Sequence, residues 1–191
     1  DFEANIAKYY VAPASIHAMV KTFPEGSHPM GMLASLICSL SGNFPDSMDS
    51  YRPEEEQMQT VYQLMALLPT VAAMIYRRSV GKDFIAPDSS LDYSANFLNM
   101  MYGGDGYKVN PDVATAINKL LILHADHEQN CSTSTVRLIG SSHASLFSSI
   151  SGGILALFGP LHGGANQAVI EMLEEIKQAG GDTTKFIAMA K

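Results

Sequence analysis

The histidine His162 has an open setting that could support chemistry. It follows a Gly-Pro bend and precedes Gly163 and Gly164, just where a helical pattern begins. The positive end of a helix dipole disfavours the protonated form of an imidazole. A neutral imidazole can donate a hydrogen bond to a developing enolate oxygen, and the two glycines leave room for a substrate backbone or thioester. The alternative is that Gly163 and Gly164 only permit a tight turn and that His162 is a surface residue.

A second concentration of polar side chains lies in the stretch ILHADHEQNCSTST. On a helix, His124 and His127 would project from one side because they are three positions apart. One interpretation is a metal site formed by these two histidines with a carboxylate or with His162. Another is a metal-free pocket in which imidazoles and the amide of Asn130 donate hydrogen bonds to an anionic ligand. The third is a polar helix end that Asn130 and Ser132 cap. The spacing alone leaves all three open.

The elements that position these residues are predicted to be helices. Apolar residues recur at helical spacing along the chain, whereas strand signals are nearly absent. One helix is expected to have a kink or break at Pro69, and another to follow Asn110-Pro111. A third helix, with an apolar stripe along one side, is expected after His162 and is predicted to end at Gly180-Gly181. Residues 132–153 are rich in Ser, Gly and Ala, which lets helices pack closely. The predicted buried face around Pro69 consists of Val61, Leu64, Met65, Leu68, Val71 and Ile75. We therefore predict an all-α fold.

Other polar residues have simpler expected roles. His28 precedes Pro29 and is expected to begin a helix, and His143 is expected to cap the helix that follows it. Arg77 and Arg78 are paired basic residues at a helix end, so we expect them to face solvent.

Composition excludes several classes of protein. The chain has 191 residues, of which 47% are apolar and 16% are charged, so it is predicted to fold around a real core. A net charge of −7 without a basic cluster argues against nucleic acid and anionic membrane surfaces as partners. Cys38 and Cys131 follow no metal or redox spacing, which fits a reducing, cytoplasmic compartment. The sequence has no uninterrupted apolar run of membrane-spanning length.

Four segments together resemble citrate synthase, in particular the bacterial form that assembles as hexamers. They run from about Gly26 to Glu175 in the family's order and read SHPMGML, LDYSANFLNMMY, LLILHADHEQNCSTSTVRLIGSS and GPLHGGANQAVIEMLEEI. The resemblance implies a multi-helical fold with a large and a small domain. It also implies dimers that share active sites, as a homodimer or as a hexamer built from dimers. Residues 1–191 would form the central part of the large domain and the start of the small domain.

The resemblance also implies a reaction. Acetyl-CoA condenses with oxaloacetate, and hydrolysis of the citryl thioester gives citrate and CoA, a step of the tricarboxylic acid cycle. By the family's motifs, His162 is the catalytic residue that stabilises the enol while an aspartate removes the methyl proton. His127 would bind oxaloacetate, and Asn130 and Ser132 would order that pocket and help to orient the catalytic histidine. No metal and no cofactor are implied, because acetyl-CoA is a substrate. The residues implied on the acetyl-CoA side are Leu161, Gly163 and Gly164.

Parts of the family's pattern do not occur in this sequence. The later Gly-Phe-Gly-His-Arg-Val motif, the catalytic aspartate and the arginines that bind the substrate carboxylates are absent. The chain also starts at Asp1 without an initiator Met and stops at Lys191 within a helical pattern. We therefore expect residues 1–191 to be a central fragment, with N-terminal and C-terminal parts absent, that is inactive alone.

Two alternatives to citrate synthesis are considered. Within the family, 2-methylcitrate synthase uses propionyl-CoA in place of acetyl-CoA. Outside the family, a metal-dependent hydrolase would use His124, His127 and His162, and a purely structural helical module would use none of them.

Overall fold

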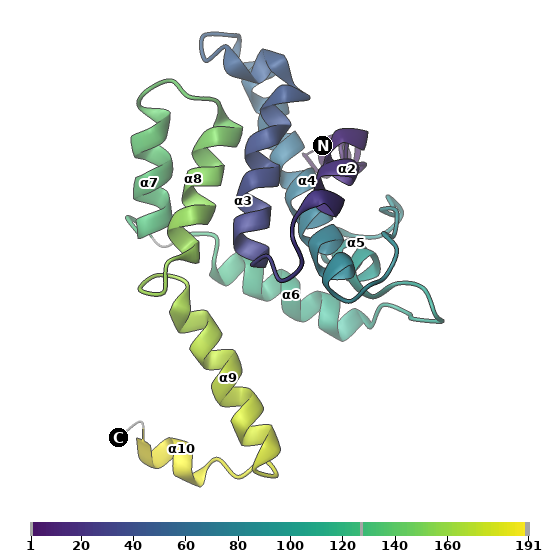
Figure 1. The fold of residues 1–191 in the computed structure, drawn as a ribbon, viewed down its shortest axis with the longest axis vertical. Helices are drawn as coiled ribbons and strands as arrows, with labels where there is room; N and C mark the ends of the chain where they lie inside the picture. The colour runs from purple at the N-terminus through teal and green to yellow at the C-terminus, as the bar shows by residue number, and fades with distance from the viewer. Residues whose placement is uncertain (1, 127, 190–191) are drawn as a thin grey trace.

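The computed structural model describes residues 2–126 and 128–189 of the chain. Within these residues it contains helices and loops but no strand, so the predicted all-α class is confirmed. The packed part of the molecule (Figure 1) comprises α1 (Phe2–Ala7), α2 (Ala14–Thr22), α3 (Pro29–Ser39), α4 (Glu54–Ser79), α5 (Tyr93–Tyr102), α6 (Pro111–Leu123), α7 (Cys131–Gly140) and α8 (Leu146–Phe158). The short 3-10 helices η1 (Leu40–Gly42) and η2 (Pro45–Met48) connect α3 to α4, and α9 (Gly164–Gln178) and α10 (Thr184–Met189) end the chain.

The main hydrophobic core lies where α2, α3, α4 and α8 meet. Leu36 and Ile37 of α3, Val71 of α4 and Phe147 of α8 are completely buried there. Each such side chain contributes about 1.5–3 kcal/mol through removal of apolar surface from water. Helices α3, α4 and α8 therefore form the frame on which the other elements are mounted.

Helix α4 continues through Pro69, so of the predicted kink or break, the break is wrong. Proline has no N–H for the carbonyl of the residue four positions earlier, here Met65. The hydroxyl of Tyr93, on α5, donates a hydrogen bond of 2.8 Å to that carbonyl. The predicted buried face is also only partly right, because Met65 is 41% exposed while Leu64, Val71 and Ile75 are buried. A donor from another helix thus replaces the bond that proline removes.

Helix α4 is also long and apolar enough to span a membrane, judged by length and composition alone. An 18-residue window of this helix has a mean hydropathy of 1.3. In the structure, 61% of that window is buried inside the protein. The helix packs against α1, α2, α3, α5 and α8. Its apolar character is accounted for by its place in the core.

The predicted close packing of helices around residues 132–153 is confirmed for α7 and α8. A Cβ atom added at Gly152 would lie 2.1 Å from Cδ1 of Ile139, and one at Gly153 would lie 2.7 Å from Cγ2 of Val136. Both distances are shorter than real Cβ contacts, so α7 approaches α8 where α8 has no side chains. On its other side, α8 is joined to α3 by the hydroxyl of Ser151, which donates to the carbonyl of Ala34 at 2.7 Å.

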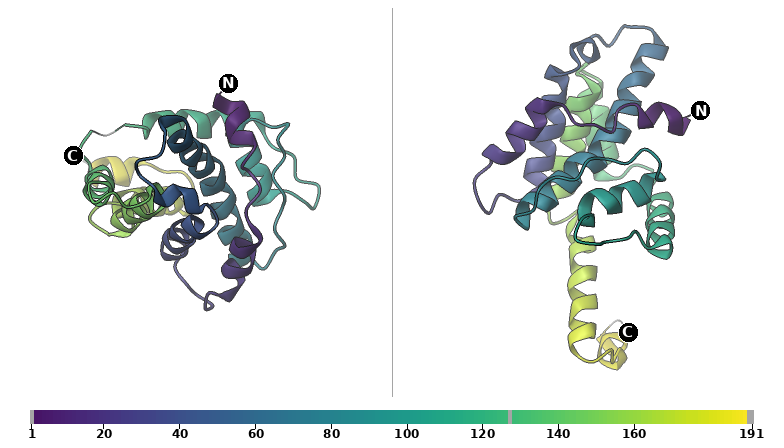
Figure 2. Two further views of the ribbon diagram at one scale, coloured as in Figure 1. Left: turned by 90° about the horizontal axis from the view of Figure 1, so that it is seen from above. Right: turned by 90° about the vertical axis from the view of Figure 1, so that its right-hand side faces the viewer.

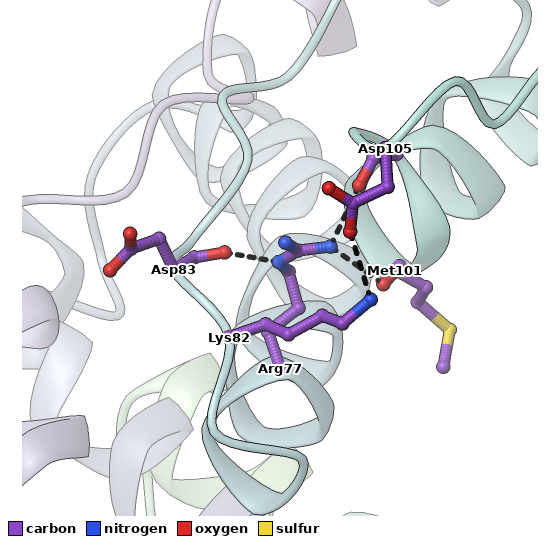
Figure 3. Close-up of polar contacts among 6 residues, drawn as sticks. Arg77, Lys82, Asp83, Met101 and Asp105 are labelled. Atoms are coloured by element: carbon purple, nitrogen blue, oxygen red, sulfur yellow. Dashed lines mark hydrogen bonds and ion pairs between the residues drawn. The ribbon is translucent and has the colours of Figure 1, made fainter.

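Arg77 is buried, so the prediction that it faces solvent is wrong. It is 6% exposed, and its guanidinium donates to the carbonyls of Asp83, Met101 and Gly103 (Figure 3). Two of these carbonyls lie at the end of α5, where a cation is favoured by the helix dipole. Arg78 is half-buried and donates to the carbonyl of Phe23. The sequence could not predict this, because only the fold brings the end of α5 to α4.

Helices α9 and α10 extend away from the packed helices (Figure 2). The predicted helix after His162 is confirmed as α9, and Gly180 and Gly181 follow it with positive φ angles of 77° and 87°. Apolar side chains on α9 are exposed, namely Val169, Ile170, Met172 and Leu173.

Candidate active site around His162

Ser132 and His162 meet at the junction of α7, α8 and α9. The Ser132 Oγ lies 2.8 Å from Nε2 of His162 and 3.0 Å from the carbonyl oxygen of Gly153. Ser132 belongs to the first turn of α7, Gly153 to the middle of α8, and His162 to the turn between α8 and α9. Both Ser132 and His162 are half-buried, so His162 is not a fully exposed surface residue. A hydroxyl group from α7 therefore contacts one nitrogen of the His162 imidazole.

The turn before α9 fixes the position of His162. The backbone N–H groups of His162 and Gly163 both donate to the carbonyl of Gly159, each at 3.0 Å. A Cβ atom at Gly163 would lie 2.1 Å from the carbonyl oxygen of Leu157, and backbone cannot move aside as a side chain can. At Gly164 the nearest atom, a Pro160 side-chain carbon, would be at 3.8 Å, an ordinary contact. The turn thus needs a glycine at 163 but not at 164.

Asn130 caps α7, which confirms one part of the capping interpretation. Its Oδ1 accepts a hydrogen bond of 2.8 Å from the N–H of Thr133, one of the donors left free at a helix start. Ser132 does not share this role, because its hydroxyl contacts Gly153 and His162. Asn130 therefore sets where α7 begins, and Ser132 follows within its first turn.

The stretch that contains His124 is not helical in the way that the spacing suggested. Helix α6 ends at Leu123, and His124 is its C-cap, with Nδ1 at 2.7 Å from the carbonyl of Leu120. The backbone of Glu128 is left-handed, with φ of 54°, and its N–H donates to the carboxylate of Asp126. The described residues 124–126 are therefore not helical. His127 itself lies outside the described residues.

A metal site gains no support from the described residues. Among residues 2–126 and 128–189, no group of three or more His, Cys, Asp or Glu side chains is placed to hold a metal ion. Within these same residues, the ring of His162 has the hydroxyl of Ser132 as a polar partner.

A cavity of about 380 Å³ borders the turn before α9. Gly163 and Gly164 line it, and so do His28 and Phe158, which sequence reasoning did not connect with the site. His28 is confirmed as the residue that begins α3, because its Nδ1 accepts from the N–H of Met30 at 3.2 Å. Its ring stacks on Phe158 with centroids 4.3 Å apart. No local sequence signal could reveal this pairing, because α3 and α8 are far apart in the chain.

Leu161 is fully exposed on the same turn. An apolar side chain in that position offers contact area to a molecule bound beside His162.

His143 does not cap α8, contrary to the prediction. Ser145 does so, with its Oγ 3.2 Å from the N–H of Ser148. His143 has a left-handed backbone with φ of 61°, and its ring stacks on Tyr51 with centroids 5.0 Å apart. Its Nδ1 lies 3.0 Å from the hydroxyl of Ser50. Ser50 also lines another cavity, of about 390 Å³, together with Gly140 and Ser145 at the ends of the α7–α8 turn.

Comparisons with known proteins agree with this geometry. The family model described as citrate synthase, C-terminal domain, matches residues 1–191. The proteins named citrate synthase 1 from the Mycobacterium tuberculosis strains CDC 1551 / Oshkosh and ATCC 25618 / H37Rv are each 47% identical to this chain over 192 residues. These alignments cover 100% of this chain and 44% of each relative, so the chain spans less than half of their length.

Two solved structures are similar to the whole arrangement of helices. The crystal structure of citrate synthase from Pyrobaculum aerophilum has a TM-score of 0.81 and 31% identity, over 92% of this chain and 45% of that chain. The crystal structure of citrate synthase from Thermotoga maritima MSB8 has a TM-score of 0.74 and 30% identity, over 91% of this chain and 43% of that chain.

Proposed function

Because the chain belongs to the citrate synthase family, we propose that the complete protein condenses acetyl-CoA with oxaloacetate and hydrolyses the product to citrate and CoA. This is an acyl transfer that feeds the tricarboxylic acid cycle. The observation that carries the proposal is the contact of 2.8 Å between Ser132 on α7 and His162, whose neighbours Gly163 and Gly164 line a cavity. Ser132 is not needed as the cap of α7, because Asn130 has that role.

His162 is proposed as the catalytic group that stabilises the enol. Its Nε2 faces Ser132, which leaves Nδ1 as the ring nitrogen that can bind the thioester carbonyl. A donor fixed in place before reaction stabilises a developing oxyanion, and loss of one such donor costs roughly 10²–10³ in kcat. The methyl proton must leave to a carboxylate base. In the family's pattern that base is an aspartate of the later segment, which residues 1–191 do not contain.

The other site residues are assigned around this centre. Asn130 and Ser132 are proposed to order the oxaloacetate pocket, and their contacts to Thr133 and His162 support that role. His127 is proposed to bind oxaloacetate on the motif alone. The residues proposed on the acetyl-CoA side are Leu161, Gly163 and Gly164, supported by the cavity and by the exposure of Leu161. No metal and no cofactor take part in the proposed reaction.

The assembly is proposed to be a homodimer or a hexamer of dimers. Exposed apolar side chains on α8 and α9 support this, because a second copy would remove them from water. Helices α1–α8 are proposed to belong to the large domain, and α9 and α10 to begin the small domain. The proposed location is cytoplasmic, supported by the free thiols of Cys38 and Cys131, and no nucleic acid or membrane partner is proposed.

The test of this function is an assay of CoA release by the complete protein. We expect release from acetyl-CoA only when oxaloacetate is present, and a lower kcat/KM with propionyl-CoA. Preference for propionyl-CoA would favour 2-methylcitrate synthase instead. Release that does not depend on oxaloacetate, or that a chelator abolishes, would contradict the proposal.

A further inference from the structure

The side chain of His28 uses its edge and its face for two different contacts. Its Nδ1 accepts a hydrogen bond of 3.2 Å from the backbone N–H of Met30, which caps the start of α3. The face of the same ring stacks on Phe158, the last residue of α8, with centroids 4.3 Å apart and ring planes inclined by 27°. His28 therefore joins the beginning of one helix to the end of another.

The first turn of α3 is the surface on which the ring of Phe158 rests. Beside the stack on His28, a Cβ atom at Gly31 would lie 3.9 Å from Cε1 of Phe158, which is an ordinary contact distance. The rest of the Phe158 side chain is open, since 42% of it is exposed. Loss of the His28 ring would therefore remove a large part of what orders this side chain.

The chain between Phe158 and His162 has little freedom of its own. Pro160 has a fixed φ and favours an extended backbone at Gly159, where φ is −63° and ψ is 137°. The carbonyl of Gly159 then accepts the N–H groups of His162 and Gly163, each at 3.0 Å. A shift at Phe158 is therefore transmitted to the imidazole of His162, because the turn between them cannot easily absorb it.

Histidine is one of few residues that could make both contacts of position 28. Asn, Asp, Ser and Thr cap a helix start with a side-chain oxygen, but they have no ring. Phenylalanine has a ring that can stack, but it offers no acceptor to a backbone N–H. The stacked pair also lines the same cavity of about 380 Å³ as Gly163 and Gly164. The contact of His28 with Phe158 thus lies on the side of the turn where acetyl-CoA is proposed to bind.

We propose that His28 is a positioning residue for His162, which acts through its stack on Phe158 and sets where the imidazole lies when the enol forms. The inference rests on the proposed function for the role of His162. The hydrogen bond to Met30 stabilises α3, whereas the stack orders the site. The two contacts can therefore be removed one at a time.

Two substitutions in the complete protein separate these contacts. His28→Asn keeps a capping oxygen and removes the ring, and we expect a kcat roughly three- to tenfold lower, with little change in the KM for oxaloacetate. His28→Phe keeps the ring and removes the acceptor. It is expected to restore most of the kcat but to unfold at a lower denaturant concentration. A low kcat in His28→Phe with a normal kcat in His28→Asn would mean that only the cap matters, and would overturn the inference.

Phe158→Leu tests the other partner of the stack. It should lower kcat by about the same factor as His28→Asn, and the double variant should be no slower than either single variant, because all three lose one contact. His17→Asn is the matched control, since His17 on α2 is paired with Phe84, with centroids 5.6 Å apart, and should keep the kcat. Factors that multiply in the double variant would show that His28 and Phe158 act independently.

A second measurement does not depend on catalysis. In ¹⁵N NMR of the complete protein with labelled histidine, the ring signals of His162 are assigned by their loss in His162→Gln. We expect these signals to shift or broaden in His28→Asn and to stay near their original positions in His28→Phe. Unchanged His162 signals in His28→Asn would overturn the inference, whatever the stability of that variant.

The two proposals fail in different ways. If the His162 signals respond as expected but the complete protein does not condense acetyl-CoA with oxaloacetate, the proposed function is wrong and the positioning by His28 stands. If condensation occurs and His28→Asn changes neither kcat nor the His162 signals, the positioning is wrong and the function stands.

Discussion

The hydroxyl of Ser132 lies 2.8 Å from Nε2 of His162, although 30 positions separate them in the sequence. The contact joins the first turn of α7 to the turn before α9. It depends on the absence of side chains at Gly153, where α7 packs on α8, and at Gly163, where the turn passes the carbonyl of Leu157. The geometry of the candidate site is therefore a consequence of helix packing rather than of local sequence.

Ser132→Ala should lower kcat without changing the fold. The substitution removes the partner of Nε2, so the imidazole is no longer held in one orientation, and a loss of roughly ten- to a hundredfold in kcat is expected. Steady-state kinetics of the complete protein measure it. Ser134→Ala is the control, because Ser134 is an exposed serine on the same helix. Equal kcat values for the two variants would refute a role for the hydroxyl.

Gly163→Ala should destabilise the protein by at least about 2 kcal/mol, because its Cβ would lie 2.1 Å from a backbone oxygen. Gly164→Ala should change the free energy of unfolding by less than about 1 kcal/mol, since its Cβ makes ordinary contacts. Denaturant unfolding at a fixed protein concentration measures both. An increased KM for acetyl-CoA in Gly164→Ala, with stability unchanged, would place this glycine against the substrate.

The raised pKa of the Tyr93 hydroxyl should make the free energy of unfolding fall at alkaline pH. Burial, and secondarily the charge of Tyr10, raise the pKa of Tyr93 from 10.0 to about 12. Between these values the unfolded chain loses the proton while the folded protein keeps it, so the free energy of unfolding falls as pH rises. The loss is up to about 2 kcal/mol after allowance for the partial exposure of the ring.

Tyr93→Phe tests this by removing the ionisable group. The fall in stability between pH 10 and 12 should become smaller, as measured by thermal unfolding at several pH values. At pH 7 the variant should lose about 1 kcal/mol, because the Met65 carbonyl opposite Pro69 loses its donor. An unchanged alkaline slope would show that Tyr93 does not hold its proton in the folded protein.

Arg77→Leu should destabilise the protein by about 3 kcal/mol, since three backbone carbonyls lose the guanidinium that bonds them. Lys82→Ala is the matched control in the same region (Figure 3). Its ion pair with Asp105 spans 3.3 Å between exposed side chains and should contribute less than about 1 kcal/mol. A similar loss for both variants would mean that the buried guanidinium has no special role.

Sequence reasoning was most successful where local chemistry decides the structure. The helical class, the N-cap at Asn130, the helix start at His28 and the glycine stop after α9 all follow from residue types within one turn. The close packing of α7 on α8 was also predictable, because small residues concentrate there.

The predictions that failed depend on contacts between distant segments. At Pro69 of α4, the carbonyl of Met65 is bonded by the hydroxyl of Tyr93 on another helix, and the buried Arg77 is bonded by the end of α5. The pairing of Ser132 with His162 was reached only through the family's motifs, since no periodicity links the two residues. His28 and Phe158 were missed for the same reason.

The most direct test of the proposed catalytic role is His162→Ala in the complete protein, assayed by oxaloacetate-dependent CoA release from acetyl-CoA. His143→Ala is the control, because this histidine follows α7 and contacts Ser50 and Tyr51. We predict that His162→Ala lowers kcat by roughly 10² or more, with circular dichroism unchanged and His143→Ala fully active. A His162→Ala protein that folds and keeps the kcat of the unsubstituted enzyme would contradict the account.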